Sequence, residues 1–200
     1  MELLWYDIRQ LDEETMARTV AMMDETRRRR VSDIAGEDDR RRTVAGELLA
    51  RRALAERLGC GEDNVPLRWD DTGKPAADAE GVYVSVSHSG PYAVCAAADV
   101  PVGVDVEVVR SADEKFMRRV CSEAEMAYIR VGDDGDCARF WEIWTAKEAL
   151  LKCRGGQFGQ LREPASFLTP EGFALPGYAF SPVQLPEGWT GTLCLAERRA

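Results

Sequence analysis

The chain has 200 residues, 45% of them hydrophobic, and its 26 basic and 35 acidic side chains give a formal net charge of −9 at pH 7. This length allows one large domain or two small ones. The acidic balance argues against general nucleic-acid binding, and no apolar run is long enough to span a membrane. The six cysteines are scattered without a Cys-x-x-Cys pair, and residues 1–7 do not resemble a signal peptide, so we expect a cytoplasmic protein with reduced thiols rather than a disulfide framework or a zinc site.

Two helices and two strands are predicted in the N-terminal half. Residues 12–30 carry an apolar stripe and end in an arginine run, where the helix dipole favours positive charge. Residues 38–58 have a second apolar stripe and end at Gly59. The runs 82–87 and 92–98 are predicted to be strands around a turn. The arginines form local clusters on an acidic protein, which suits an anionic small molecule better than a long polyanion.

The C-terminal half is predicted to begin with a strand and to contain an aromatic-rich helix. Residues 100–109 are rich in Val, which is typical of a buried strand. Ser122 and Glu125 have the spacing of a capping box and predict the start of a short helix. Residues 138–153 are predicted to be a helix that two glycines end, and the run 191–196 to be the last strand.

Three carboxylates and a lysine in this half have spacings that bring them together in pairs. Asp105 and Glu107 are two residues apart in a strand, so their side chains point to the same face, roughly 6–7 Å apart along the strand. Glu148 and Lys152 are four residues apart and share a helix face. Such charges are too costly to bury in an apolar setting without a metal or a charged ligand.

Each pair also has a simpler interpretation. On the local pattern alone, the solvent face of a strand is the favoured reading of Asp105 and Glu107. Glu148 and Lys152 fit a surface ion pair that adds little stability. The decision between these readings depends on whether the two pairs occur together with further motifs.

Four motifs in order resemble the signature of the 4'-phosphopantetheinyl transferases, most closely the larger, single-chain members that prime peptide and polyketide synthases. The family pattern is Gly-x-Asp-x-Glu followed some forty residues later by Trp-x-x-Lys-Glu-Ala-x-x-Lys. The matching segments here are Gly73–Pro75, Val84–Ser89, Gly103–Glu107 and Trp144–Lys152. Any one of these motifs is a weak signal, whereas all four in order are a specific one.

The resemblance implies an α+β fold of two similar subdomains, residues 1–100 and 101–200, related by a pseudo-twofold axis with the active site in the cleft between them. Residues 1–100 would contact the phosphates of coenzyme A, and residues 101–200 would carry the metal site and the carrier-docking surface. The runs 92–97 and 192–196 are similar in character and would each close one half of the chain. The family expectation is a monomer.

The resemblance also implies the reaction. The 4'-phosphopantetheine group of coenzyme A would be transferred to a serine of an apo acyl, peptidyl or polyketide carrier protein, with release of 3',5'-ADP. Asp105, Glu107 and Glu148 would be the ligands of a Mg²⁺ ion, which prefers oxygen donors. Glu148 would also be the general base, directly or through a metal-bound water, and Lys152 would neutralise the leaving phosphate.

The resemblance also implies the contacts to coenzyme A. Lys74 and His88 match family residues that hold the phosphates, with Ser87 beside them, and Arg42 and Thr43 match a family Arg-Thr pair. Arg27 and Arg30 have the spacing at which family members place basic residues for the 3'-phosphate. Arginine suits phosphate because its guanidinium donates two parallel hydrogen bonds. The arginines at 27–30 also fit a solvated helix end, and a shift of register by one residue would change which of them point inward.

Two other functions compete with the transferase. A non-catalytic module that binds coenzyme A or a carrier would explain why Gln157 stands where many family members have a second glycine after the lysine. A different magnesium enzyme acting on a nucleotide pyrophosphate is a more remote reading. The sequence does not identify the carrier or the pathway that is served.

Overall fold

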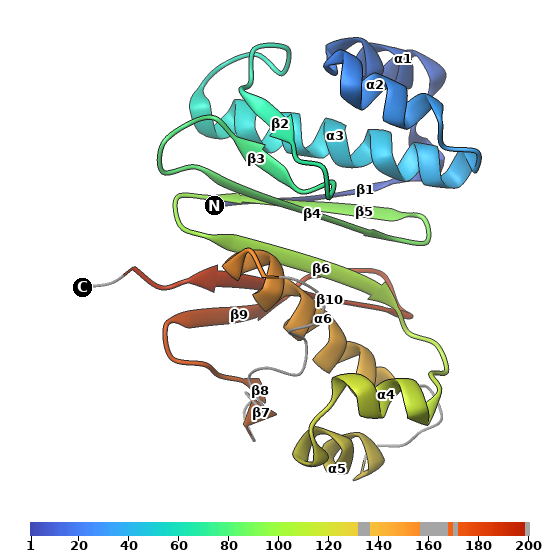
Figure 1. Ribbon diagram of the computed structural model, residues 1–200, viewed down its shortest axis with the longest axis vertical. Coiled ribbons are helices and arrows are strands. Elements are labelled where there is room, and N and C mark those ends of the chain that lie inside the picture. The colour runs from blue at the N-terminus through green and yellow to red at the C-terminus, as the bar shows by residue number, and fades with distance from the viewer. Residues whose placement is uncertain (132–136, 157–167, 170–171, 199–200) are drawn as a thin grey trace. The chain divides into compact units, whose positions relative to one another are not determined.

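The chain divides into two units, Met1–Asp99 and Val100–Ala200, each of which makes its contacts mainly within itself (Figure 1). The computed structural model describes residues 1–131, 137–156, 168–169 and 172–198. Both units combine helices with a small antiparallel sheet, so the predicted α+β class is confirmed. Within the described ranges, no helix is both long enough and apolar enough to cross a membrane.

The N-terminal unit contains a three-stranded sheet in the order β1-β5-β4 and a short ribbon of β2 and β3, all antiparallel. Its elements are β1 (Glu2–Asp7), a 3₁₀ turn (Ile8–Gln10), α1 (Glu13–Met22), α2 (Glu25–Ser32), α3 (Glu37–Leu58), β2 (Leu67–Trp69), β3 (Pro75–Ala77), β4 (Tyr83–Ser89) and β5 (Tyr92–Ala98). The long helix α3 lies between the sheet and the α1–α2 pair (Figure 1).

The helix predicted over residues 12–30 is two helices. Met23 is buried and extended, and it ends α1. The Asp24 carboxylate accepts a hydrogen bond from the Arg27 backbone N–H at 2.9 Å, so it caps a new helix, α2. The helix predicted over 38–58 is confirmed as α3, and Gly59 ends it in the left-handed region at φ 66°.

The core of the N-terminal unit lies between α3 and the sheet. The central strand β5 is buried along its whole length. Small residues of α3, such as Ala45 and Ala53, let the helix approach the strand closely. Gly46 lies against Val86, which is 3.0 Å from where a Cβ would be. On its other side, α3 packs through Val44 and Leu48 against the α1–α2 pair.

The C-terminal unit contains a second three-stranded antiparallel sheet, in the order β6-β10-β9, and a short β7-β8 ribbon. Its elements are β6 (Val102–Val108), α4 (Glu114–Val120), α5 (Glu123–Val131), α6 (Ala138–Arg154), β7 (Leu168–Thr169), β8 (Gly172–Phe173), β9 (Tyr178–Pro182) and β10 (Trp189–Ala196). Helix α6 packs across β6 and β10.

The elements predicted in this half are present in the structure. The capping box is formed, because the Glu125 carboxylate accepts from the Ser122 backbone N–H at 2.7 Å and the Glu125 N–H donates to the Ser122 hydroxyl at 3.3 Å. The aromatic side chains of α6, Phe140, Trp141 and Trp144, pack against one another and against α4. They therefore belong to the core.

The two units share one topology. Each begins with an edge strand, continues through helices of which the last is the longest, and ends with the strand that lies in the centre of its sheet. The two runs of similar character in the sequence, 92–97 and 192–196, belong to these central strands, β5 and β10. The prediction of two similar subdomains is confirmed, whereas the pseudo-twofold axis and the cleft stay predictions.

Candidate active site

Helix α6 lies directly on strand β6 at Gly103. A Cβ at Gly103 would be 1.9 Å from the Ala149 carbonyl oxygen and 2.5 Å from the Cys153 backbone nitrogen, so the contact admits only glycine. Because alternate residues of a strand share a face, Asp105 and Glu107 lie on this same side of β6. The sequence Gly-x-Asp-x-Glu therefore places two carboxylates next to α6.

We expect Gly103→Ala to lower the free energy of unfolding by at least about 3 kcal/mol, since the methyl group meets backbone atoms that have no free direction in which to move. Urea unfolding measures the effect. Gly36→Ala is the matched control, because the nearest neighbour of its Cβ is the flexible Asp39 side chain at 3.0 Å. Equal losses in the two variants would contradict the close contact.

Lys152 holds one of the two strand carboxylates. Its Nζ donates to Asp105 Oδ1 at 2.7 Å and to the Val104 carbonyl oxygen at 3.0 Å. Asp105 is 5% exposed, while the Lys152 side chain keeps 28% of its surface. The ammonium thus compensates a buried carboxylate and also reaches the surface.

Glu148 faces the same cluster from α6. Burial and the neighbouring charges of Asp105 and Glu107 together raise the pKa of Glu148 to about 7, while Lys152 opposes the shift. A carboxyl group with a pKa near 7 is suited to proton transfer at neutral pH. The charges of Asp105, Glu107, Glu148 and Lys152 therefore interact with one another in the structure.

The raised pKa of Glu148 makes the stability of the metal-free protein depend on pH. Between the ordinary value of 4.5 and about 7, the folded protein binds a proton that the unfolded chain releases, so this contribution to stability is lost as the pH rises through that window. We expect Glu148→Gln to be more stable than the parent by roughly 1–3 kcal/mol at pH 8, and equally stable at pH 4. Urea unfolding in EDTA at both pH values tests this, and a variant that is less stable at pH 8 would contradict it.

The chemistry of this cluster fits a hard divalent cation. Its donors are carboxylate oxygens, the ligands that Mg²⁺ prefers, and their mutual repulsion is relieved by a cation. In the described ranges, however, no three acidic, histidine or cysteine side chains are already grouped around one metal position. Coordination by Asp105, Glu107 and Glu148 together stays a prediction.

The motif lysine Lys147 has a different environment from Lys152. Its Nζ donates to Glu125 Oε2 and to the Val120 carbonyl oxygen, both at 2.8 Å, and both charged side chains are almost completely buried. This pair joins α6 to the start of α5. The residue pattern does not predict this pair, although the capping box at Ser122 indicates that Glu125 has a fixed position.

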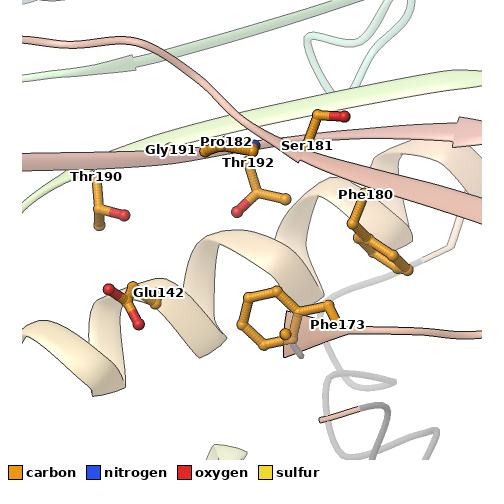
Figure 2. Close-up of a pocket in the computed structure, with 9 residues that line it drawn as sticks. Glu142, Phe173, Phe180, Ser181, Pro182, Thr190, Gly191 and Thr192 are labelled. Carbon is orange, nitrogen blue, oxygen red and sulfur yellow. The ribbon is translucent and has the colours of Figure 1, made fainter. Parts of the chain in front are cut away.

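A cavity of about 290 Å³ lies beside the carboxylates in the C-terminal unit. Figure 2 shows Glu142 of α6 across from Thr190 and Thr192 of β10, with two aromatic rings nearby. The lining residues are Glu142, Gly172, Phe173, Phe180, Ser181, Pro182, Thr190, Gly191 and Thr192. Thr190 pairs with Glu107 and Thr192 with Asp105 in the β6–β10 register, so the cavity shares a sheet face with these carboxylates. Residue patterns do not predict this cavity, because separate elements form its walls.

Arg27 and Arg30 are the partly buried members of the arginine run in α2, while Arg28 and Arg29 are exposed. The sequence does not decide which arginines of this run point inward, and in the structure they are Arg27 and Arg30. Both line a cavity of about 260 Å³, together with Asp24, Thr26 and Trp69.

Arg30 and Lys74 meet at the turn between β2 and β3. Arg30 donates to the Asp70 carbonyl oxygen and to the Asp71 carboxylate, each at 3.0 Å. The Lys74 backbone N–H donates to the Asp70 carboxylate at 2.9 Å, which fixes the turn. The Lys74 side chain is exposed at this turn.

Arg42, Thr43 and His88 lie around the first turns of α3. Arg42 donates to the Gly90 carbonyl oxygen at 2.8 Å and pairs with Asp39, and Thr43 donates to the Asp39 carbonyl oxygen at 2.8 Å. Arg42 lowers the pKa of the Asp39 carboxyl, and His88 contributes to the same shift. Ser87, one residue earlier on β4, is 8% exposed. The predicted residues of the N-terminal unit thus form two groups, with Ser87 beside the second.

Two family models match the chain in sequence order. Residues 10–100 match the model of the 4'-phosphopantetheinyl transferase N-terminal region, and residues 101–181 match the model of the 4'-phosphopantetheinyl transferase superfamily. Both regions therefore occur in tandem in one chain, which agrees with the larger, single-chain type.

Proteins of the same family are similar over much of the chain. The 4'-phosphopantetheinyl transferase gsp of Aneurinibacillus migulanus is 32% identical over 118 residues, 58% of this chain and 49% of that protein. The 4'-phosphopantetheinyl transferase Sfp of Bacillus subtilis is 24% identical over 152 residues, 75% of this chain and 68% of that protein. A phosphopantetheinyl transferase of Thraustochytrium is 32% identical over 175 residues, 78% and 61% of the two chains. The chain spans about half to two thirds of the length of these relatives, and it belongs to the 4'-phosphopantetheinyl transferase superfamily.

Proposed function

We propose that the protein transfers the 4'-phosphopantetheine group of coenzyme A to a serine of an apo carrier protein, with Mg²⁺ as the cofactor and 3',5'-ADP as the by-product. The observation that carries the proposal is the convergence of Asp105, Glu107, Glu148 and Lys152 between β6 and α6, in a chain of this family. We further propose that the protein acts as a cytoplasmic monomer.

The catalytic roles follow from the environment of each side chain. A Mg²⁺ ion held by Asp105, Glu107 and Glu148 would neutralise phosphate charge when bound. Glu148 accepts the proton of the carrier serine hydroxyl, directly or through a metal-bound water. Lys152 lies beside Asp105 with part of its surface exposed, so its ammonium is available to the phosphate group as negative charge develops there.

The N-terminal unit supplies the proposed contacts to the phosphates of coenzyme A. The two groups described above contain several cationic side chains within an acidic protein, which supports local binding of an anionic small molecule. The proposed contacts are Arg27, Arg30, Arg42, Thr43, Lys74, Ser87 and His88. Ser87 is the most buried of these seven residues. We therefore expect it to hold strand β4, and with it His88, in position and not to contact the phosphates directly.

The first test is intact mass spectrometry of apo carrier proteins incubated with the protein, coenzyme A and Mg²⁺. We expect a mass gain of one phosphopantetheine group, and no gain when EDTA removes the metal. Carriers of fatty-acid, polyketide and peptide synthases should be compared, because the structure does not select among them. No gain on any of the three would contradict the transferase.

One observation favours the non-catalytic module as a second candidate. The Lys152 ammonium donates to Asp105 Oδ1, one of the proposed metal ligands. Gln157, the departure from the family pattern, lies outside the described residues. Calorimetry separates the two candidates, since tight coenzyme A binding without turnover on any carrier would support the module.

A further inference from the structure

Arg27 is held between an indole ring and a buried carboxylate. Its guanidinium carbon lies 3.8 Å from the centroid of the Trp69 ring, and only 11% of the side chain is exposed. Its Nε is 3.6 Å from Glu47 Oε2 and has no hydrogen-bond partner among the described residues. The side chain is thus fixed in position by the indole and by a long ion pair with Glu47, while its Nε makes no hydrogen bond within the described part of the chain.

The charges around Arg27 leave a buried excess of positive charge. Glu47 is 1% exposed, and its Oε1 already accepts from Arg51 Nε at 2.8 Å. Arg51 is itself satisfied by the Met22 carbonyl oxygen at 2.7 Å and the Glu62 carbonyl oxygen at 3.1 Å. Two buried guanidinium groups therefore share one carboxylate, whose second oxygen also has no hydrogen-bond partner among the described residues. Such a cluster is stabilised by one more anion.

The groups that face Arg27 from other directions do not supply that anion. Asp24 lines the cavity, but it is exposed and its carboxylate caps α2 by accepting from the Arg27 backbone N–H. Arg30, the other cation of the cavity, pairs with the exposed Asp71. Burial lowers the pKa of the Arg27 guanidinium, Glu47 opposes this shift, and Arg30 adds to it. An anion in the cavity would compensate both arginines.

Trp69 decides how such an anion can approach. The indole covers one face of the guanidinium, so the terminal N–H groups at the edge of Arg27 are left for the cavity. A guanidinium edge donates parallel hydrogen bonds to a phosphate, and stacking on tryptophan fixes this edge before the ligand arrives. The alternative, a flexible arginine, would lose side-chain entropy on binding.

We infer that Trp69 and Glu47 are positioning residues that hold Arg27 ready for a phosphate monoester, and that Trp69 thereby makes the protein select coenzyme A over its 3'-dephospho form. The inference rests on the proposed function for the identity of the ligand. It adds two residues to the predicted contacts, and neither of them carries a charge that attracts phosphate.

The test compares calorimetric affinities for coenzyme A and 3'-dephospho-coenzyme A. We expect Trp69→Leu to reduce the preference for coenzyme A about tenfold, which corresponds to about 1.4 kcal/mol, with the affinity for the dephospho form unchanged. Trp69→Phe keeps an aromatic face and should retain most of the preference. The kcat at saturating coenzyme A should stay the same, and only KM should rise.

Trp5→Leu is the matched control, because it removes the same atoms from the same unit at an exposed indole that contacts Tyr92 edge to face and does not stack on an arginine. It should leave the preference unchanged. Equal weakening of both ligands in Trp69→Leu, or an unchanged preference, would overturn the inference.

A second probe separates this inference from the proposed function. Adenosine 3',5'-bisphosphate and adenosine 5'-monophosphate differ in the same phosphate. If coenzyme A does not bind but the bisphosphate is preferred in a way that depends on Trp69, the inference holds and the proposed function is wrong. If neither pair of ligands shows a preference for the 3'-phosphate, the inference is wrong, whatever the carrier assay gives.

Discussion

Glu148→Gln is expected to fold and to transfer phosphopantetheine at least about a hundredfold more slowly than the parent. The amide has the shape of the carboxyl group but cannot take up the serine proton, and it is a poorer ligand for Mg²⁺. In the metal-free protein the pKa of Glu148 is about 7, so protons compete with Mg²⁺ for this carboxylate, and kcat/KM of the parent at limiting Mg²⁺ should fall as the pH decreases from 8 to 6. A time course of carrier mass at several pH values measures both effects.

Glu142→Gln is the matched control for this prediction. Glu142 lies on the same helix, and burial raises its pKa as well, but it faces the cavity of Figure 2. We expect its transfer rate and pH profile to be close to those of the parent. Full activity of Glu148→Gln would contradict the assignment of Glu148 both as the general base and as a ligand of Mg²⁺.

Lys147→Met is expected to lower the free energy of unfolding by about 3–5 kcal/mol, because it leaves Glu125 charged, buried and without its partner. Glu125→Gln should lower the free energy of unfolding by a similar amount, because it leaves Lys147 charged, buried and without Glu125. The double variant should recover much of the loss, since it leaves neither charge buried. Urea unfolding followed by tryptophan fluorescence measures all three.

Arg118→Met provides the comparison for the buried pair. It removes an exposed i, i+4 ion pair with Glu114, which contributes less than about 1 kcal/mol. Each variant removes one positive charge, so the difference between their free energies of unfolding measures the effect of burying the ion pair. If Lys147→Met were as stable as Arg118→Met, the pair would be solvated, and its role in joining α6 to α5 would be wrong.

The elements that the sequence predicts well are those whose pattern is local. The Val run and Gly103 predict β6, and the stripe of α3 with Gly59 at its end predicts that helix almost to the residue. The break between α1 and α2 was missed. Both segments have helical character, and Asp24 was not recognised as the cap that starts a new helix.

The candidate site also contains residues that local patterns relate and residues that they do not. The sharing of a face by Asp105 and Glu107 follows from the period of a strand. By contrast, Trp69 and Glu47 reach Arg27 from β2 and α3, and nothing in the local sequence relates these three positions. Thr190 and Thr192 likewise become neighbours of the carboxylates only through the pairing of β10 with β6. Contacts of this kind depend on topology, which residue patterns do not encode.

The shared topology of the two units also has a consequence for synthesis on the ribosome. In each unit the central strand is made last, so neither three-stranded sheet is able to form before β5 or β10 has emerged. Until then, β1 and β4 have no strand between them, and neither do β6 and β9. The nascent chain therefore carries unpaired strand edges until β5, and later β10, has emerged, and such edges are open to pairing with other chains.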